Sequence, residues 1–285
     1  MTSVLWLGLA FGSIAALAIG LSAYGAVRWA DSTRWLLARL EDGRMPTTAT
    51  RYDAAELEGL PAPVQRYFHA VLTTGQPIVT AVSFDMTGTF NLSATGEQWK
   101  AFTSRQHVII RRPGFVWDAR IAMLPGLTVR VVDSYIAGQG LLRAAILGLF
   151  KVADLSGEGE IARGEFMRFF AEAVWYPTAL LPSQGVRWAA VDARSAKATM
   201  ADGPLTLTLL FRFNDEGLID SFRAEARGSM VGKEMVMAPW EGSFSDYRTR
   251  DGMRVPNTGE VAWLRPDGRK PYFRGTLTAL SYEQT

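Results

Sequence analysis

Between Val4 and Val27 the chain carries no charged residue. At ~1.5 Å of rise per residue this stretch would be about 36 Å long as a helix, and the hydrocarbon core of a bilayer is about 30 Å thick. The alternative, a buried core helix of a globular domain, is disfavoured because the stretch has no opposite polar face. We therefore expect a transmembrane helix over residues 4–27, through which the protein is bound to a membrane.

A cleaved signal peptide is the alternative to a retained anchor. Signal peptides have a basic start, a shorter apolar stretch and a small-residue cleavage site. No basic residue precedes Val4, and the residues from Val27 to Asp31 do not form such a site. We expect residues 1–45 to form the anchor and a juxtamembrane helix, and residues 46–285 to form one β-rich domain that resembles a ligand-binding domain.

The predicted location is the cell membrane, crossed once. Arginines follow the apolar stretch and no Lys or Arg precedes it, so the positive-inside rule places the domain in the cytoplasm. The chain has no cysteine, which fits either side of the membrane.

Composition excludes several function classes. The chain has 30 Lys and Arg against 28 Asp and Glu, and these charges are interspersed, so we expect no nucleic-acid partner. Without cysteine and with only two histidines, the chain has neither a thiolate nucleophile nor a Cys/His zinc site. Phosphate-loop, dinucleotide-binding, zinc-protease and serine-hydrolase motifs are also missing. We expect no cofactor and no metal.

From Ile78 onward, apolar and polar residues alternate with a period of two, which predicts half-buried antiparallel strands. The clearest alternations lie at 82–90, 115–123, 205–213 and 222–227, and in the last of these Arg227 falls on the polar face. Further strands are expected at 98–112, 127–136, 186–191, 194–200, 233–248, 259–265 and 271–282.

Helices are expected at three places in the domain. Asp53 is a candidate N-cap for a short helix over 54–60, and a second helix follows over 64–72. Residues 138–181 are expected to form a helical insertion, with its main helix over 163–176. The predicted fold class is mainly β (α+β): a large curved antiparallel sheet or half-open barrel, with helices packed on its concave side.

Four stretches of the sequence are recognisable together. They are LPAPVQRYF at 60–68, PGFVWDAR at 113–120, EAVWYPTALLP at 172–182 and PWEGSFSDY at 239–247. In this order they resemble an uncharacterised family of bacterial proteins that is known only as a domain of unknown function. The resemblance covers about residues 55–285, and it implies no reaction and no catalytic residue.

A more distant similarity is to the lipoprotein-carrier (LolA/LolB-like) fold. The strand count, the order of the helical elements and the pattern from Gln106 to Trp117 carry this similarity. It implies a half-open barrel with helices over an apolar cavity, in the periplasm, so it disagrees with the positive-inside rule about the side of the membrane. The chain departs from that fold family because it has no lipid-bearing cysteine and has the predicted anchor.

Two places offer candidate catalytic carboxylates. Glu165, Arg168 and Glu172 form one stripe on the predicted helix over 163–176, where paired carboxylates could act as acid and base. Asp133 falls on the apolar face of its strand, where an unpaired charge is costly. The structural alternatives are a salt-bridge stripe for the helix and a hydrogen bond to a nearby arginine for Asp133.

Large apolar side chains suggest a ligand cavity, with a well-filled core as the alternative. The candidate ligand-binding residues are Trp117, Phe166, Phe170, Trp175, Leu209, Phe211 and Trp240. The first hypothesis is a membrane-anchored module that binds a lipid or another hydrophobic ligand. The alternatives are an enzyme that acts on a membrane-derived substrate, with Glu172 or Asp133 as general base, and a structural partner in an envelope complex.

Overall fold

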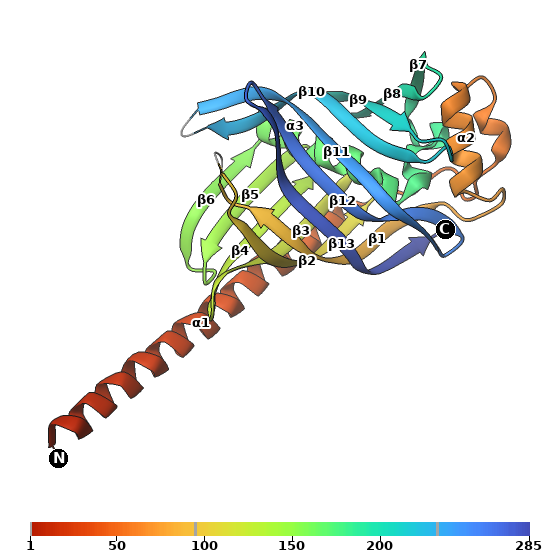
Figure 1. Ribbon diagram of the computed structural model, residues 1–285. Coiled ribbons are helices and arrows are strands. Elements are labelled where there is room, and N and C mark those ends of the chain that lie inside the picture. The colour runs from red at the N-terminus through yellow and green to blue at the C-terminus, as the bar shows by residue number, and fades with distance from the viewer. Residues whose placement is uncertain (1, 94–95, 232–233) are drawn as a thin grey trace.

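The computed structural model describes residues 2–93, 96–231 and 234–285, and the side chains of residues 2–5, 8, 10, 11, 14, 15 and 231 lie outside this description. One mainly antiparallel sheet dominates the fold and curves around the helix α3 (Figure 1). The strands of its first half are β1 (Val79–Asn91), β2 (Trp99–Ile109), β3 (Gly114–Leu124), β4 (Leu127–Ile136), β5 (Gln139–Ile146) and β6 (Phe150–Gly157). Those of its second half are β7 (Arg187–Asp192), β8 (Ser195–Asp202), β9 (Leu205–Phe213), β10 (Ile219–Val231), β11 (Glu234–Arg250), β12 (Met253–Arg265) and β13 (Gly268–Gln284).

The strand order shows how the two halves join. Each half is a meander of neighbouring antiparallel strands, and β1 pairs with β13 at the centre, so the first and last strands of the domain are hydrogen-bonded neighbours. Strands β6 and β7 form the two edges, and the sheet is therefore open. The predicted large antiparallel sheet with helices is confirmed, and each alternating stretch of the sequence lies in a strand.

Residues 139–157 differ from the prediction. They form the hairpin β5–β6, whereas a helical insertion was expected to begin at 138. The reason is that β5 is covered on both faces. Leu141 and Ala145 pack under the helix α1, and Leu142 and Ala144 face the interior of the curved sheet. A strand buried on both faces shows no alternation, so its apolar run resembles that of a buried helix.

The helix α3 (Glu160–Glu172) lies inside the curve of the sheet and leads into the 3-10 segments η2 (Ala173–Trp175), η3 (Pro177–Leu180) and η4 (Pro182–Gln184). Gly140 on β5 allows α3 to come this close, because a Cβ at Gly140 would lie 2.6 Å from the backbone nitrogen of Ala162. The main core fills the space between α3, these segments and the sheet.

Two short helices complete that side of the domain. The segment η1 (Ala54–Leu57) begins at Asp53, whose carboxylate accepts a hydrogen bond from the backbone nitrogen of Ala55 at 3.0 Å, as the predicted N-cap requires. The helix α2 (Ala62–Val71) follows, and its Tyr67 and Phe68 pack against Phe213 and Trp188. Both helices lie at the end of the sheet where β7, β8 and β9 lie (Figure 1).

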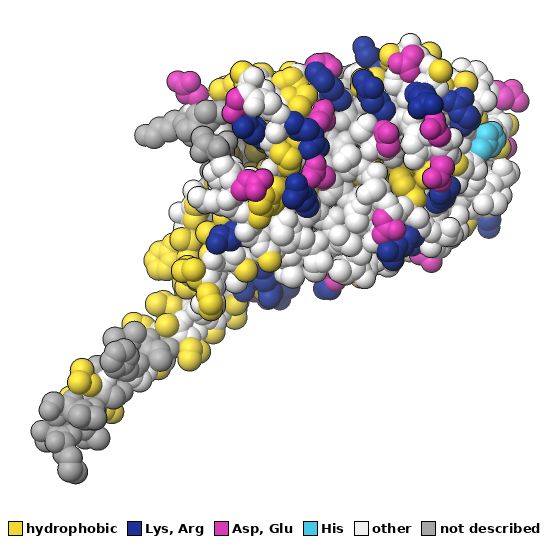
Figure 2. Space-filling view, in the orientation of Figure 1, with side chains coloured by type: hydrophobic (Ala, Val, Ile, Leu, Met, Phe, Trp, Pro, Cys, Tyr) yellow, Lys and Arg dark blue, Asp and Glu magenta, His cyan; other side chains and the backbone are white. Residues whose placement is uncertain are grey.

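The helix α1 (Thr2–Asp42) lies on the opposite face of the sheet from α3. Trp29, Leu36 and Leu40 form a second, smaller core with apolar residues of β2 to β5. The residues that were expected to form a juxtamembrane helix thus belong mostly to the second half of α1, which packs on the domain. The first half extends beyond the sheet and exposes apolar side chains, as Figure 2 shows.

The expected transmembrane helix is not supported. Its residues belong to α1, but several of their side chains lie outside the described part of the structure. In the part that is described, no helix combines the length and the apolar character that a membrane span needs.

Candidate functional site

A cavity of about 740 Å³ lies between α3 and the inner face of the sheet. Strands of both halves line it, from β3 to β6 on one side and from β10 to β13 on the other. Its apolar lining includes Trp117, Ile121, Met123, Val129, Val131, Leu142, Ala144, Leu155, Trp175, Phe222, Trp240, Phe244, Val261, Trp263 and Phe273. Its polar lining includes Asp133, Glu165, Arg168, Glu172 and Arg227. A mostly apolar cavity of this size with a few converging polar groups is typical of a small-molecule site.

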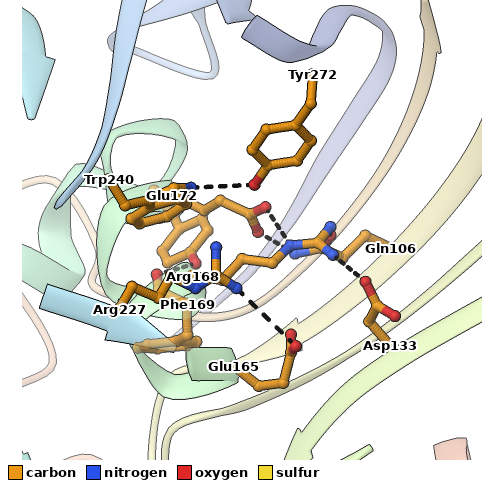
Figure 3. Close-up of polar contacts among 10 residues, drawn as sticks. Gln106, Asp133, Glu165, Arg168, Phe169, Glu172, Arg227, Trp240 and Tyr272 are labelled. Atoms are coloured by element: carbon orange, nitrogen blue, oxygen red, sulfur yellow. Dashed lines mark hydrogen bonds and ion pairs between the residues drawn. The ribbon is translucent and has the colours of Figure 1, made fainter. Parts of the chain in front are cut away.

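Arg168 is the centre of the polar groups (Figure 3). From α3 its guanidinium donates to Glu172 Oε1 at 2.7 Å, to Asp133 Oδ2 on β4 at 2.8 Å and to Gln106 Oε1 on β2 at 3.1 Å. Gln106 Nε2 in turn donates to Glu172 Oε2 at 2.5 Å. These contacts join α3 to two strands of the first half of the sheet.

Aromatic rings hold the same guanidinium from the side. The Cζ of Arg168 lies 4.6 Å from the ring centroid of Trp117 and 5.1 Å from that of Phe115. Burial alone would lower the pKa of Arg168, but the neighbouring carboxylates of Glu172 and Asp133 raise it above its ordinary value. Arg168 therefore stays charged, and both carboxylates and aromatic rings contact its guanidinium.

Two carboxyl groups of the site have shifted acidity. Burial raises the pKa of Asp133 to about 6, although Arg168 acts in the opposite direction. Burial, together with the nearby charge of Asp133, raises the pKa of Glu165 to about 8. Asp133 Oδ1 and Glu165 Oε2 are buried and have no hydrogen-bond partner among the described residues. At neutral pH Glu165 is mostly protonated, whereas Asp133 is mostly ionised.

A second arginine, Arg227 on β10, lies across the cavity from Asp133 (Figure 3). Its Cζ lies 4.2 Å from the ring centroid of Trp240 and 5.8 Å from that of Trp263. Its Nη2 is 4.0 Å from Glu165 Oε1, which is an ion pair but too long for a hydrogen bond.

The inward position of Arg227 corrects the sequence prediction, which placed it on the polar face with Arg223 and Glu225. The pairing of β10 with β11 shifts register between Ala224 and Arg227. This bulge adds one residue to β10, and so Arg227 lies on the same buried face as Phe222 and Ala224. Gly228, which follows the shift, is a sequence signal for a bulge or bend, but it does not tell which face Arg227 takes.

The predicted site residues fall into two groups. Glu172, Asp133, Trp117, Trp175 and Trp240 all line the cavity. The structure does not place the other four there. Phe166, Phe170, Leu209 and Phe211 are fully buried in the core and are not among the lining residues.

Burial places those four residues in the core, and ring contacts show the packing of three of them. Phe170 packs edge-on against Phe211, with ring centroids 5.9 Å apart, and Phe166 stacks on Tyr135 at 5.0 Å. Phe166 and Phe170 belong to α3, and Leu209 and Phe211 belong to β9. The sequence prediction missed Gln106 and Arg227, since the partners that reveal their roles are distant in the sequence.

The geometry limits what chemistry the carboxylates can perform. Glu172 accepts a hydrogen bond at each of its oxygens, so it would have to lose one before acting as a general base. Asp133 is held by Arg168 at Oδ2 and keeps Oδ1 unpartnered among the described residues. Within the described residues, no group of three histidine, aspartate or glutamate side chains is placed to hold a metal ion.

Comparison with known proteins gives a family and two structural likenesses. Residues 58–282 match the model of a family described as "Family of unknown function (DUF6920)", which confirms the resemblance carried by the four sequence stretches. Among curated proteins no match was found.

Two solved structures are similar to this chain. One is a LolA superfamily protein from Nitrosomonas europaea, with a TM-score of 0.40 and 7% identity over 79% of this chain and 93% of that one. The other is a β-barrel-like protein of the domain of unknown function DUF1849 from Brucella abortus, with a TM-score of 0.21 and 12% identity over 73% of this chain and 99% of that one. At these TM-scores neither likeness bears on the ligand or the activity.

Proposed function

We propose that this chain, which belongs to the family of unknown function DUF6920, binds a lipid or another hydrophobic ligand in the cavity between α3 and the sheet. The observation that carries the proposal is the cavity itself. Its volume of about 740 Å³ is within the range of small-molecule sites, and aromatic and aliphatic side chains from both halves of the sheet line it.

The way α3 is held supports a preformed cavity. The contacts of Arg168 with Gln106, Asp133 and Glu172 join α3 to the first half of the sheet. On the other side Arg163 donates to the backbone oxygen of Ala226 on β10 at 3.0 Å. A helix that is fixed to both halves of the sheet keeps the cavity open. Ligand binding then requires no free energy to separate packed surfaces.

The first experiment measures binding directly. The purified full-length protein is titrated with the neutral dye Nile red, and co-purified lipids are extracted into organic solvent and identified by mass spectrometry. We expect saturable dye fluorescence and a bound lipid mass in the extract. Saturable dye binding that a co-purified lipid displaces would establish the cavity as a hydrophobic binding site.

Matched variants locate the binding. Val131 and Ala144 are cross-strand partners on β4 and β5 that line the cavity, and phenylalanine at either position narrows it. Val131→Phe and Ala144→Phe should weaken dye binding at least tenfold. The control is Val191→Phe on the edge strand β7, where the side chain is exposed and does not line the cavity. Equal dye binding by all three variants would contradict the proposal.

Association with the cell membrane is a separate proposal. It is supported by the exposed apolar side chains on the first half of α1, among them Trp6, Leu17 and Ile19. Met235 and Met237 on β11 are exposed as well. Fractionation of cells should place the full-length protein in the membrane pellet, and high salt should not release it. Recovery in the supernatant without detergent would contradict this proposal.

A further inference from the structure

Arg227 is an unusual cation because it is buried and yet donates no hydrogen bond to any residue that the structure describes. Its side chain is 10% exposed. Its contacts are the rings of Trp240 and Trp263 and the oxygen of Glu165 at 4.0 Å. A guanidinium has five N–H donors, and burying them unused is costly.

Glu165 is a weak partner for this cation. Its nearest oxygen lies 4.0 Å from Arg227 Nη2, too far for a hydrogen bond, and burial raises the pKa of its carboxyl group, which favours the neutral form. Arg168, by contrast, has three hydrogen-bonding partners and two aromatic neighbours. Three arginines line the cavity, and Arg265 donates to Ser229 Oγ at 2.7 Å. Of the three, only Arg227 donates no hydrogen bond to a residue that the structure describes.

Trp240 and Trp263 fix the orientation of the guanidinium. Trp240 is itself held by a hydrogen bond from its Nε1 to the hydroxyl of Tyr272 at 3.0 Å. An arginine that is stacked on a fixed ring presents its planar fork in one direction, which suits two-point binding of a carboxylate or a phosphate.

On the side away from Arg227 the cavity lining is mostly apolar, apart from Asp133 on β4. Ile121, Met123, Val129, Leu142 and Leu155 line it there, on β3 to β6. A ligand that complements both Arg227 and this apolar lining has a charged end and an apolar chain.

On the basis of the proposed function, we propose that the ligand is an amphiphile with an anionic head, a carboxylate or a phosphate, which Arg227 binds through its free N–H groups while the apolar chain lies against β3 to β6. We assign the preference for an anionic head to Arg227. Arg265 and Lys270 also line the cavity, but they already bind Ser229 and Asp267.

The test compares ligands that share one chain and differ in the head. Laurate, dodecyl phosphate, dodecanol and dodecyltrimethylammonium are used, below their micelle concentrations, to displace Nile red from the full-length protein at neutral pH. We expect laurate or dodecyl phosphate to bind at least tenfold more tightly than dodecanol, so that a tenfold lower concentration displaces the dye. The cationic ligand should bind most weakly. The ratio between laurate and dodecyl phosphate distinguishes a carboxylate from a phosphate head.

Two variants assign the preference to Arg227. Arg227→Gln should lose the advantage of the anionic ligands and leave dodecanol binding unchanged, whereas Arg223→Gln on the same strand, which does not line the cavity, should behave like the wild type. If Arg227→Gln does not fold, Arg227→Lys replaces it. Lysine keeps the charge but lacks the planar fork, so laurate should bind at least threefold more weakly while dodecanol is unaffected.

The outcomes separate this inference from the proposed function. Dye binding with no preference for anionic heads, or a preference that survives in Arg227→Gln, overturns the inference and leaves the hydrophobic site in place. A wild-type protein that does not bind Nile red, dodecanol or laurate overturns both.

Discussion

Replacing Arg168 with methionine is expected to be one of the most destabilising changes in this protein. Methionine keeps an unbranched apolar chain between Phe115 and Trp117 but removes the guanidinium. Asp133 then loses its one hydrogen bond to a described residue, and Glu172 keeps only its bond from Gln106. Two largely buried carboxylates are left without their cation.

The size of the effect follows from this burial. The side chains of Arg168, Asp133 and Glu172 are 14%, 12% and 15% exposed, so water does little to replace the lost partner. Removing one member of a buried ion pair costs about 3–5 kcal/mol, against a typical free energy of unfolding of about 5–15 kcal/mol. We expect Arg168→Met to lose about 3–5 kcal/mol near pH 8.

The loss should depend on pH and on Asp133. The pKa of Asp133 is raised from 3.8 to about 6 in the folded protein, so its contribution to stability is fully present below pH 3.8 and is lost as the pH rises through 6. Without Arg168 this pKa rises further, because the ion pair that lowers it is gone. The cost of Arg168→Met should therefore be smaller near pH 5 than near pH 8. The double variant Arg168→Met/Asp133→Asn should be more stable than the single variant near pH 8.

Urea unfolding followed by tryptophan fluorescence measures these differences, since Trp117 lies against the altered side chain. The control is Arg105→Met on β2, which removes an exposed arginine that donates to Asp85 at 2.8 and 2.9 Å. An exposed pair of this kind contributes about 0–1 kcal/mol. A loss in Arg168→Met no larger than that in Arg105→Met, or a double variant less stable than the single one, would refute the reasoning.

Three further changes test other parts of the structure. Glu165→Gln should flatten the pH dependence of unfolding, because the pKa of Glu165 is raised to about 8 and the stability that it contributes is lost as the pH rises through that value. In urea, the drop in the free energy of unfolding from pH 7 to pH 9 should be smaller in the variant than in the wild type by at least about 1 kcal/mol. Phe170→Ala should lower the free energy of unfolding, measured in urea, by about 3–5 kcal/mol. The folded variant should still bind Nile red, because Phe170 is in the core and does not line the cavity; lost dye binding would contradict this. Gly140→Ala should push α3 from β5, so the thermal midpoint should fall and dye binding should weaken; an unchanged midpoint would show that α3 does not depend on this contact.

Much of the fold could be predicted from local sequence. Alternation with a period of two located strands such as β1, β3 and β9, because each has one face in the core and one in solvent. The same argument failed for β5, whose two faces are covered by α1 and by the interior of the sheet. There the pattern reports burial but cannot distinguish a strand from a helix.

The candidate site was predictable only in part. The stripe of Glu165, Arg168 and Glu172 follows from helical spacing, and Asp133 was noticeable as a charge on an apolar strand face. Both structural alternatives to catalysis have a basis in the contacts: Glu172 is paired along the helix, and Asp133 is bound by an arginine. One arginine binds both carboxylates because α3 packs against β4, and local sequence patterns do not predict this packing.

The sequence by itself determined where most strands lie, which residues cap and pack the helices, and which families of catalytic site are excluded, because these depend on the order of neighbouring residues. The tertiary structure decided the pairing of β1 with β13, the shared role of Arg168 and the inward position of Arg227. The pairing joins segments almost two hundred residues apart, and the bulge in β10 reverses the face of every residue after it. Such features arise from the best total packing of the sheet, and so no short stretch of sequence contains them.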